Sequence, residues 1–130
     1  LVMADIDNFK LYNDSLGHQE GDHCLAAVAE VFLRAMGRAG DLAARYGGEE
    51  MIFLIPGADH ASALSMAEGL RAACEALAIQ HPASSVCPVV TISLGVASCV
   101  PALDASAESL VAQADAALYR AKEAGRNRVC

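Results

Sequence analysis

Two consecutive glycines between two strand-like segments constrain this chain more than any other feature. Residues 45–51 read RYGGEEM, in which Gly47 and Gly48 are followed at once by Glu49 and Glu50. Glycine accepts the backbone angles of a tight turn and lets backbone amides approach a ligand closely. The apolar run MIFLI that follows predicts a buried strand. The segment therefore predicts a β-hairpin with adjacent carboxylates at its tip, where they are either simply solvated or hold a hard cation over a phosphate.

A second acidic segment opens the chain. It reads LVMADID, an apolar strand that ends in Asp5 and Asp7. Because Asp5 stands where the strand stops, its carboxylate can project from the sheet edge. Asp7 is a candidate N-cap for a short helix beginning near Asn8, and the first-turn amides of that helix offer an anion site. The spacing of the two aspartates also suggests a calcium loop, but Phe9 and Lys10 stand where that loop needs an oxygen ligand and a glycine, so we exclude it.

A cationic helix end closes the chain. Residues 114–128 read ADAALYRAKEAGRNR, which predicts a helix ending at Gly125. Lys122 and Arg126 are four residues apart and bracket that end. Cations near a helix C-terminus offset the helix dipole, and the same two side chains could bind phosphate. Taken alone, the pattern leaves both interpretations open.

Together these segments resemble the GGDEF family of diguanylate cyclases. The matching motifs are DIDxFKxxND at 5–14, GHxxGD at 17–22, RYGGEE at 45–50, TISLGVA at 91–97 and ALYxAKxxGRN at 117–127. They follow the family's order and cover nearly the whole chain. One departure is Met51, where the family normally has phenylalanine. Because it begins an apolar strand, we expect a packing position and a small effect on activity.

The element order predicts an α+β fold of the βαββαβ type, an antiparallel-rich sheet with helices packed on it. The resemblance implies the same architecture, that of the nucleotidyl-cyclase and polymerase palm, with the first strand beside the hairpin so that Asp5 and Glu49 meet. The expected elements are strands at 1–5, on both sides of 47–48, at 89–97 and at 128–130, and helices at 9–15, 21–36, 60–78 and 107–124. The expected inward residues of the two long central helices are Leu25, Val28, Ala29, Phe32 and Leu33, then Leu64, Ala67, Leu70, Ala73, Cys74 and Leu77.

Length and composition limit the functional class. The 130 residues suit one domain, and 55% of them are hydrophobic. The net charge of -7 argues against nonspecific binding of nucleic acid. Five scattered cysteines suit a reducing cytoplasm, and no apolar run approaches the roughly 20 residues of a membrane span. We expect residues 1–130 to be a single cytoplasmic GGDEF domain that lacks its N-terminal helix and loop. A sensory or dimerisation domain is expected upstream, and the full-length protein could be membrane-anchored.

The resemblance implies that two GTP molecules condense into cyclic di-GMP with release of pyrophosphate. Catalysis would take place at the interface of a homodimer, with two Mg²⁺ per active site and Mn²⁺ as an alternative ion. The implied metal ligands are Asp5, Glu49 and the main-chain carbonyl of Ile6. Glu50 stands beside them as a third catalytic residue, either a base or a residue that orients the ligands.

The resemblance also assigns the nucleotide contacts. Asn13 and Asp22 would read the guanine edge, and the residue types fit because an aspartate accepts from guanine N1–H and N2–H, donors that adenine lacks. The remaining implied substrate-binding residues are Gly47 and Gly48 of the hairpin, the main-chain amides of Asn8, Phe9 and Lys10, and the side chains of Lys122 and Arg126.

Residues 38–41 read RAGD and resemble the family's Arg-x-x-Asp product-inhibition site. Arg38 would bind guanine and phosphate of cyclic di-GMP through its planar fork, and Asp41 the guanine edge. The alternative is a helix-terminal arginine followed by an aspartate at a strand entry. A second arginine often completes this site. Arg71 is near in sequence, but Gly69 is the aligned position, so that half is open.

Three functions are compatible with these motifs. The first is an active diguanylate cyclase. The second is a noncatalytic GGDEF receptor that binds cyclic di-GMP or GTP, which the intact set of acids and cations opposes. The third is a mononucleotide cyclase of the related palm fold, which the guanine residues and the Arg-x-x-Asp motif oppose.

Overall fold

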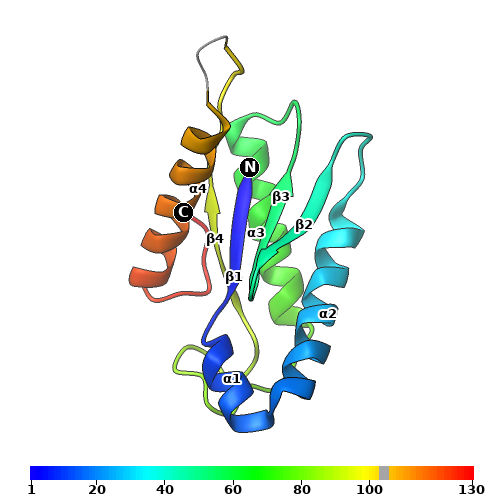
Figure 1. Cartoon of the computed structure of the whole chain (residues 1–130), viewed down its shortest axis with the longest axis vertical. Helices are drawn as coiled ribbons and strands as arrows, with labels where there is room; N and C mark the ends of the chain where they lie inside the picture. Colours follow the sequence, from blue (N-terminus) through cyan, green and yellow to red (C-terminus); the bar gives the residue numbers. More distant parts are fainter. Residues whose placement is uncertain (103–105) are drawn as a thin grey trace.

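The first strand of the chain lies in the interior of its sheet. The computed structural model describes residues 1–102 and 106–130, which form a four-stranded antiparallel sheet in the order β2-β3-β1-β4 (Figure 1). The elements are β1 (Val2–Ile6), α1 (Phe9–Leu16), α2 (His18–Ala35), β2 (Leu42–Gly47), β3 (Glu50–Leu54), α3 (His60–Ala76), β4 (Ile92–Val96) and α4 (Ala107–Glu123). The predicted α+β fold is confirmed, and strand one does lie beside the hairpin.

Alternate residues of β1 serve two different layers. Val2, Ala4 and Ile6 belong to the larger apolar cluster, which α2 and α3 cover, whereas Met3 packs in a smaller cluster with α4. Asp5 is on the same side as Met3, because successive side chains of a strand point to opposite faces. One acid at the end of β1 therefore faces α4.

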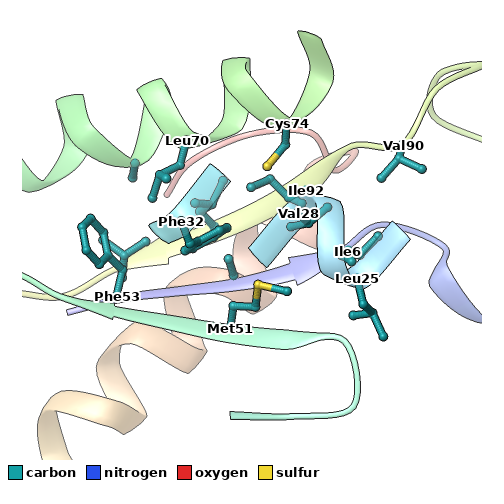
Figure 2. Close-up of a cluster of buried hydrophobic side chains, with 14 of the residues drawn as sticks. Ile6, Leu25, Val28, Phe32, Met51, Phe53, Leu70, Cys74, Val90 and Ile92 are labelled. Atoms are coloured by element: carbon teal, nitrogen blue, oxygen red, sulfur yellow. The ribbon is translucent and has the colours of Figure 1, made fainter. Parts of the chain in front are cut away.

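The larger layer is an aliphatic core with few aromatic rings (Figure 2). The rings of Phe32 and Phe53 meet edge to face, with centroids 6.5 Å apart. Leu70 and Cys74 of α3 belong to the same cluster and are buried. Met51 is buried in the same layer, which is the packing position expected from the sequence.

Gly95 allows α4 to pack directly on β4. A methyl group at Gly95 would overlap the Ala114 carbonyl and the Leu118 amide of α4. The close approach fixes α4 against the sheet, and Lys122 follows one turn after Leu118. The glycine of the TISLGVA motif thus positions a cation at the sheet end.

Several sequence-based details need correction. Helix α2 begins at His18, directly after Gly17, whose φ of 87° separates it from α1. Leu33 and Leu77 were expected to point inward but are 49% and 39% exposed, and Ala73 is exposed as well. Leu33 faces a hollow beside β2. Leu77 is the C-cap of α3, at the end of that helix.

The last residues lie against β4. Val129 forms a parallel bridge with Leu94, whose amide donates to the Arg128 carbonyl at 2.9 Å. The predicted short strand is therefore an isolated bridge. None of the helices in residues 1–102 and 106–130 combines the length and the apolarity needed to cross a bilayer.

Candidate active site

The glycine hairpin forms as predicted. Gly47 pairs with Glu50, and the turn between them consists of Gly48, with φ 54°, and Glu49. The Arg45 guanidinium donates through Nε to the Gly48 carbonyl at 2.7 Å. The pairing shifts register between Arg45 and Gly47, so the tip bends away from the regular ladder.

Three carboxylates gather at this end of the sheet. Asp5 pairs with Glu50 across the β1–β3 ladder, and Glu49 is the next residue on the turn. Burial raises the pKa of Asp5, the hydrogen bond from Lys122 lowers it, and the charges of Glu49 and Glu50 raise it again. Lys122 Nζ lies 2.8 Å from Asp5 Oδ2. The sheet end is therefore an acidic cluster with one lysine on it.

Glu49 and Glu50 face different surroundings. Glu49 lines a polar cavity with α1 and α2. Glu50 lines a separate hollow of about 650 Å³ beside α4, together with Met3 and Tyr46. The two adjacent acids of the hairpin thus line different cavities.

The polar cavity has a volume of about 360 Å³ and collects most of the predicted nucleotide residues. Its lining is Phe9, Lys10, Asn13, Asp14, His18, Asp22, Leu25, Arg45, Gly48 and Glu49. Asn8, Gly47, Lys122 and Arg126 are not part of this lining. Four lining residues were not assigned to the substrate by the sequence analysis: Asp14, His18, Leu25 and Arg45. All but Leu25 stand inside the quoted motifs. An adjoining hollow of about 420 Å³ shares Asp22 and Arg45 but is mostly apolar, which suits phosphates poorly.

Gly21 sets the position of Asn13. A methyl group at Gly21 would overlap Asn13 Oδ1 and crowd Phe9. Asn13 Oδ1 is buried and has no hydrogen-bond partner in the described part of the chain. A buried acceptor without a donor costs about 1–3 kcal/mol, which a donor on a bound ligand would recover.

Asp7 is not an N-cap, which corrects the sequence-based expectation. Its carboxylate is buried and accepts hydrogen bonds from the Thr91 and Ser93 hydroxyls at 2.8 and 2.6 Å. The cap position of α1 is Asn8, in a left-handed conformation with φ 56° and without a side-chain cap. Its side chain instead donates to Ser85 Oγ at 3.1 Å. The first-turn amides of α1 thus remain available for an anion.

The C-terminal turn after α4 also adopts left-handed backbone angles. Gly125, Arg126 and Asn127 have φ values of 108°, 61° and 46°. The Arg126 amide donates to the Ala121 carbonyl at 3.0 Å and closes the helix. Arg126 therefore belongs to the turn after α4, whereas Lys122 forms an ion pair with Asp5. The two side chains that were predicted to bind phosphate together thus have different surroundings.

The Arg38–Asp41 motif forms a closed turn. Asp41 Oδ2 accepts from the Gly37 and Arg38 amides at 3.2 and 3.0 Å, and the Arg38 side chain is exposed. Asp41 Oδ1 is buried and unpaired among residues 1–102 and 106–130. One arginine and one aspartate acceptor are thus presented together.

Arg71 is committed to a different network. Its guanidinium contacts Glu68 at 2.8 Å and Glu75 at 2.7 Å, and it donates to Asn127 Oδ1 at 2.7 Å. The side chain is 17% exposed. Gly69, the aligned position, faces open space. Neither residue offers a second free guanidinium to the Arg38–Asp41 turn.

The sequence of this chain matches a known protein family. The family model described as "Diguanylate cyclase, GGDEF domain" matches residues 1–128. The chain belongs to the GGDEF family. Among curated relatives, this GGDEF domain is 43% identical over 129 residues to diguanylate cyclase A of Treponema denticola and 42% identical to diguanylate cyclase DgcM of Escherichia coli K12. Both matches include 99% of this chain but only 34% and 30% of the two relatives, so the chain spans about a third of their length.

Solved structures agree with the fold. The GGDEF domain of DgcB from Caulobacter crescentus, crystallised with c-di-GMP, has a TM-score of 0.86 and 35% identity, and the match covers 98% of this chain and 74% of that one. The active GGEEF domain of a diguanylate cyclase from Vibrio cholerae has a TM-score of 0.81 and 34% identity, covering 99% of this chain and 79% of that one. The palm-like architecture of this GGDEF domain is therefore established by both sequence and structure.

Proposed function

We propose that this GGDEF domain is the catalytic part of a diguanylate cyclase. Each GTP 3′-hydroxyl attacks the α-phosphorus of the other GTP, and two pyrophosphates leave as cyclic di-GMP closes. The observation that carries the proposal is the acidic cluster around Asp5 and Glu49 beside the polar cavity that holds Asn13 and Asp22. Relatives named diguanylate cyclases support it.

The donor set at the cluster fits magnesium. Magnesium takes few carboxylates and completes its shell with phosphate oxygens and water. Asp5, Glu49 and the Ile6 carbonyl would supply such a set. No group of three or more His, Cys, Asp or Glu side chains in the described residues is arranged to hold a metal ion, so phosphate oxygens and water would complete the shell. Two Mg²⁺, or Mn²⁺ in their place, would neutralise phosphoryl charge and lower the pKa of the attacking hydroxyl.

The cavity residues select guanine. Asp22 accepts from N1–H and N2–H, and Asn13 offers the second polar contact, with an amide oxygen that needs a donor. Adenine would leave both acceptors unpaired in a partly buried cavity, which disfavours ATP strongly. Gly21 contributes by leaving room for the Asn13 side chain.

The ends of α1 and α4 hold the β- and γ-phosphates. The amides of Asn8, Phe9 and Lys10 point from the uncapped start of α1, and the backbone of Gly47 and Gly48 permits close approach at the hairpin. Lys122 and Arg126 add positive charge from the end of α4. These groups bind and orient the leaving pyrophosphate.

Glu50 orients the metal-binding carboxylates and does not contact the substrate. It raises the pKa of Asp5 through its charge and faces the α4 side, away from the cavity that Glu49 lines. Between the roles of base and orienting residue, this placement favours the second.

Catalysis requires two copies of the domain. One cavity and one acidic cluster serve one GTP, and the reaction joins two, so two protomers face each other with their hairpins at the centre. An upstream sensory or dimerising domain in the full-length protein would control that encounter. Cyclic di-GMP bound at Arg38 and Asp41 would inhibit it, with a single arginine per domain.

Product analysis tests the proposal against its alternatives. The purified domain is incubated with GTP and Mg²⁺, and the products are identified by mass. Cyclic di-GMP supports the cyclase, whereas cyclic GMP would indicate a mononucleotide cyclase. Binding of cyclic di-GMP with no turnover, even at high protein concentration, would indicate a receptor.

A further inference from the structure

The buried carboxylate of Asp7 has no role in the proposed chemistry, yet it accepts three hydrogen bonds. The side chain is 1% exposed. Its two oxygens accept from Thr91 Oγ1 at 2.8 Å, Ser93 Oγ at 2.6 Å and the Asn127 amide at 3.0 Å. A charge is buried only where such donors satisfy it. The third donor lies 120 residues away, in the turn after α4.

The left-handed backbone of that turn requires stabilising contacts from other parts of the chain. Three consecutive residues, Gly125, Arg126 and Asn127, have positive φ, and only the first is a glycine. A left-handed arginine is strained and persists where surrounding contacts impose it. The conformation of Arg126 therefore depends on whatever fixes its neighbours.

Asn127 is fixed on several sides. Its main-chain N–H donates to the Asp7 carboxylate. Its side-chain Oδ1 accepts from Arg71 Nη1 at 2.7 Å, and its side-chain Nδ2 donates to Glu75 Oε1 at 3.2 Å. Arg71 and Glu75 are themselves paired on α3 at 2.7 Å. The turn that carries Arg126 is thus anchored by one carboxylate from the β1–α1 connection and one ion pair from α3.

Asp7 also directly precedes the start of α1, whose first amides are the other proposed phosphate contact. Its own amide donates to the Thr91 carbonyl at 2.9 Å, and the next residue is the left-handed Asn8 at the start of α1. The Asn8 carbonyl lies 3.1 Å from His81 Nε2, which holds the segment from the other side. The backbone of one residue fixes the α1 amides while its side chain fixes the Arg126 turn.

We propose that Asp7 is a positioning residue that holds the two phosphate-binding segments, the amide end of α1 and the Arg126 turn, in a fixed relation. The proposal rests on the proposed function, since it takes the triphosphate as the shared ligand. Asp7 touches neither nucleotide nor metal and acts on affinity through Arg126.

Substitutions around Asp7 separate positioning from general stability. Asp7→Ala removes all three acceptor contacts, so the turn relaxes and the KM for GTP rises about tenfold, with kcat changed less than about threefold, because ground-state binding is lost. Asp7→Asn restores part of the affinity, since its amide oxygen still accepts from the Asn127 amide. Thr91→Val removes one hydrogen bond from the same carboxylate but none from the turn, and leaves KM unchanged.

A double-mutant cycle with Arg126→Ala provides the decisive test. Affinity for a nonhydrolysable GTP analogue with Mg²⁺ is measured by calorimetry for the wild type, Asp7→Ala, Arg126→Ala and the double variant, and thermal unfolding is followed for each. If Asp7 acts through Arg126, the double variant binds as weakly as Arg126→Ala alone. Additive losses, or a Thr91→Val loss as large as that of Asp7→Ala, overturn the proposal.

Further outcomes distinguish this inference from the proposed function. If Asp7→Ala does not fold, Asp7→Asn takes its place in the same cycle, because it keeps the side-chain volume and loses one of the two carboxylate oxygens that accept from Thr91, Ser93 and the Asn127 main-chain amide. Nonadditivity with Arg126→Ala is expected there as well, and additivity overturns the inference. A wild type that binds no GTP analogue contradicts both proposals, whereas one that binds, with a clear Arg126→Ala effect and none for Asp7→Ala, contradicts this inference alone.

Discussion

Lys122 Nζ lies 2.8 Å from Asp5 Oδ2, so α4 and β1 are joined at the acidic end of the sheet. The lysine was expected to bind phosphate and the aspartate to bind metal. The residue expected to bind phosphate and the residue expected to bind metal therefore form an ion pair with each other. The Lys122 hydrogen bond also opposes the rise in the Asp5 pKa that burial and the two neighbouring acids cause.

Asp5→Asn should abolish turnover while leaving the fold intact. Loss of one charged ligand should lower the rate on the order of 100-fold or more, as for removal of a contact to the transition state. Cyclic di-GMP formation and thermal unfolding are measured on the same preparations. Glu30→Gln, at an exposed pair on α2, serves as the control. Substantial turnover by Asp5→Asn with Mg²⁺ would remove Asp5 from the metal site.

The same substitution should change the pH dependence of stability. The net pKa of Asp5 in the folded chain is raised above 3.8, so the folded state holds this proton at higher pH than the unfolded state. Its contribution to stability is complete below 3.8 and is lost as pH rises through the folded pKa. Denaturant titrations should show wild type losing stability relative to Asp5→Asn as pH rises from 3.8 to neutrality. A difference that stays constant, or that moves the other way, would contradict this placement of the carboxylate.

Gly21→Ala should weaken GTP binding without destroying the fold. The added methyl group overlaps Asn13 Oδ1, so Asn13 must leave its position at the cavity. Loss of one hydrogen bond to guanine, worth about 1.4 kcal/mol, predicts a KM about tenfold higher. Gly69→Ala is the matched control, a helical glycine facing open space, and should raise stability by about 0.5–1 kcal/mol at unchanged KM. Equal KM values for the two variants would exclude Asn13 from guanine recognition.

The cysteines should fall into two reactivity classes. Burial raises the pKa of Cys24 to about 11 and that of Cys74 to about 12, whereas Cys99 is exposed. A thiol reagent at pH 8 should modify Cys99 rapidly and leave Cys24 and Cys74 unmodified until the chain unfolds. Peptide mass mapping identifies the modified sites. Early labelling of Cys74 would mean that α3 does not cover the sheet as described.

Arg38→Ala should relieve product inhibition. Cyclic di-GMP is expected to inhibit wild type noncompetitively with GTP, because the Arg38–Asp41 turn is not part of the lining of the cavity around Asn13. The variant should keep its turnover and lose affinity for cyclic di-GMP in calorimetry. Arg34→Ala, which breaks only an exposed pair with Glu30, should behave as wild type. Unchanged affinity in Arg38→Ala would exclude the site.

Local signals in the sequence were sufficient for the hairpin and the sheet. Gly47 and Gly48 between two apolar strands predict a turn whose chemistry is encoded within a few residues. The role of Asp7 was not predictable in the same way. An aspartate before a helix is most often a cap, and only the folded chain brings Thr91, Ser93 and Asn127 around it.

Arg71 and Leu33 also differ from what the sequence suggested. Arg71 stood near the expected second half of the product site, but its partners Glu68 and Glu75 lie one helical turn away on either side and hold it on α3. Leu33 continued the apolar stripe of α2, yet the sheet edge at β2 leaves it half exposed. Periodicity predicts which face of a helix is apolar, and only the tertiary structure shows which residues of that face the sheet covers.

The initial rate of cyclic di-GMP formation as a function of protein concentration tests the central claim most directly. In the proposed mechanism two protomers each supply one GTP, and the apolar faces of this domain are largely used in its own core. The domain is therefore expected to be mainly monomeric, with a specific activity that is low at micromolar concentration and rises with concentration. A coiled-coil dimeriser fused before Leu1 should raise it further by increasing the effective concentration. Cyclic di-GMP produced at a rate strictly proportional to the concentration of a demonstrated monomer would contradict the two-protomer mechanism.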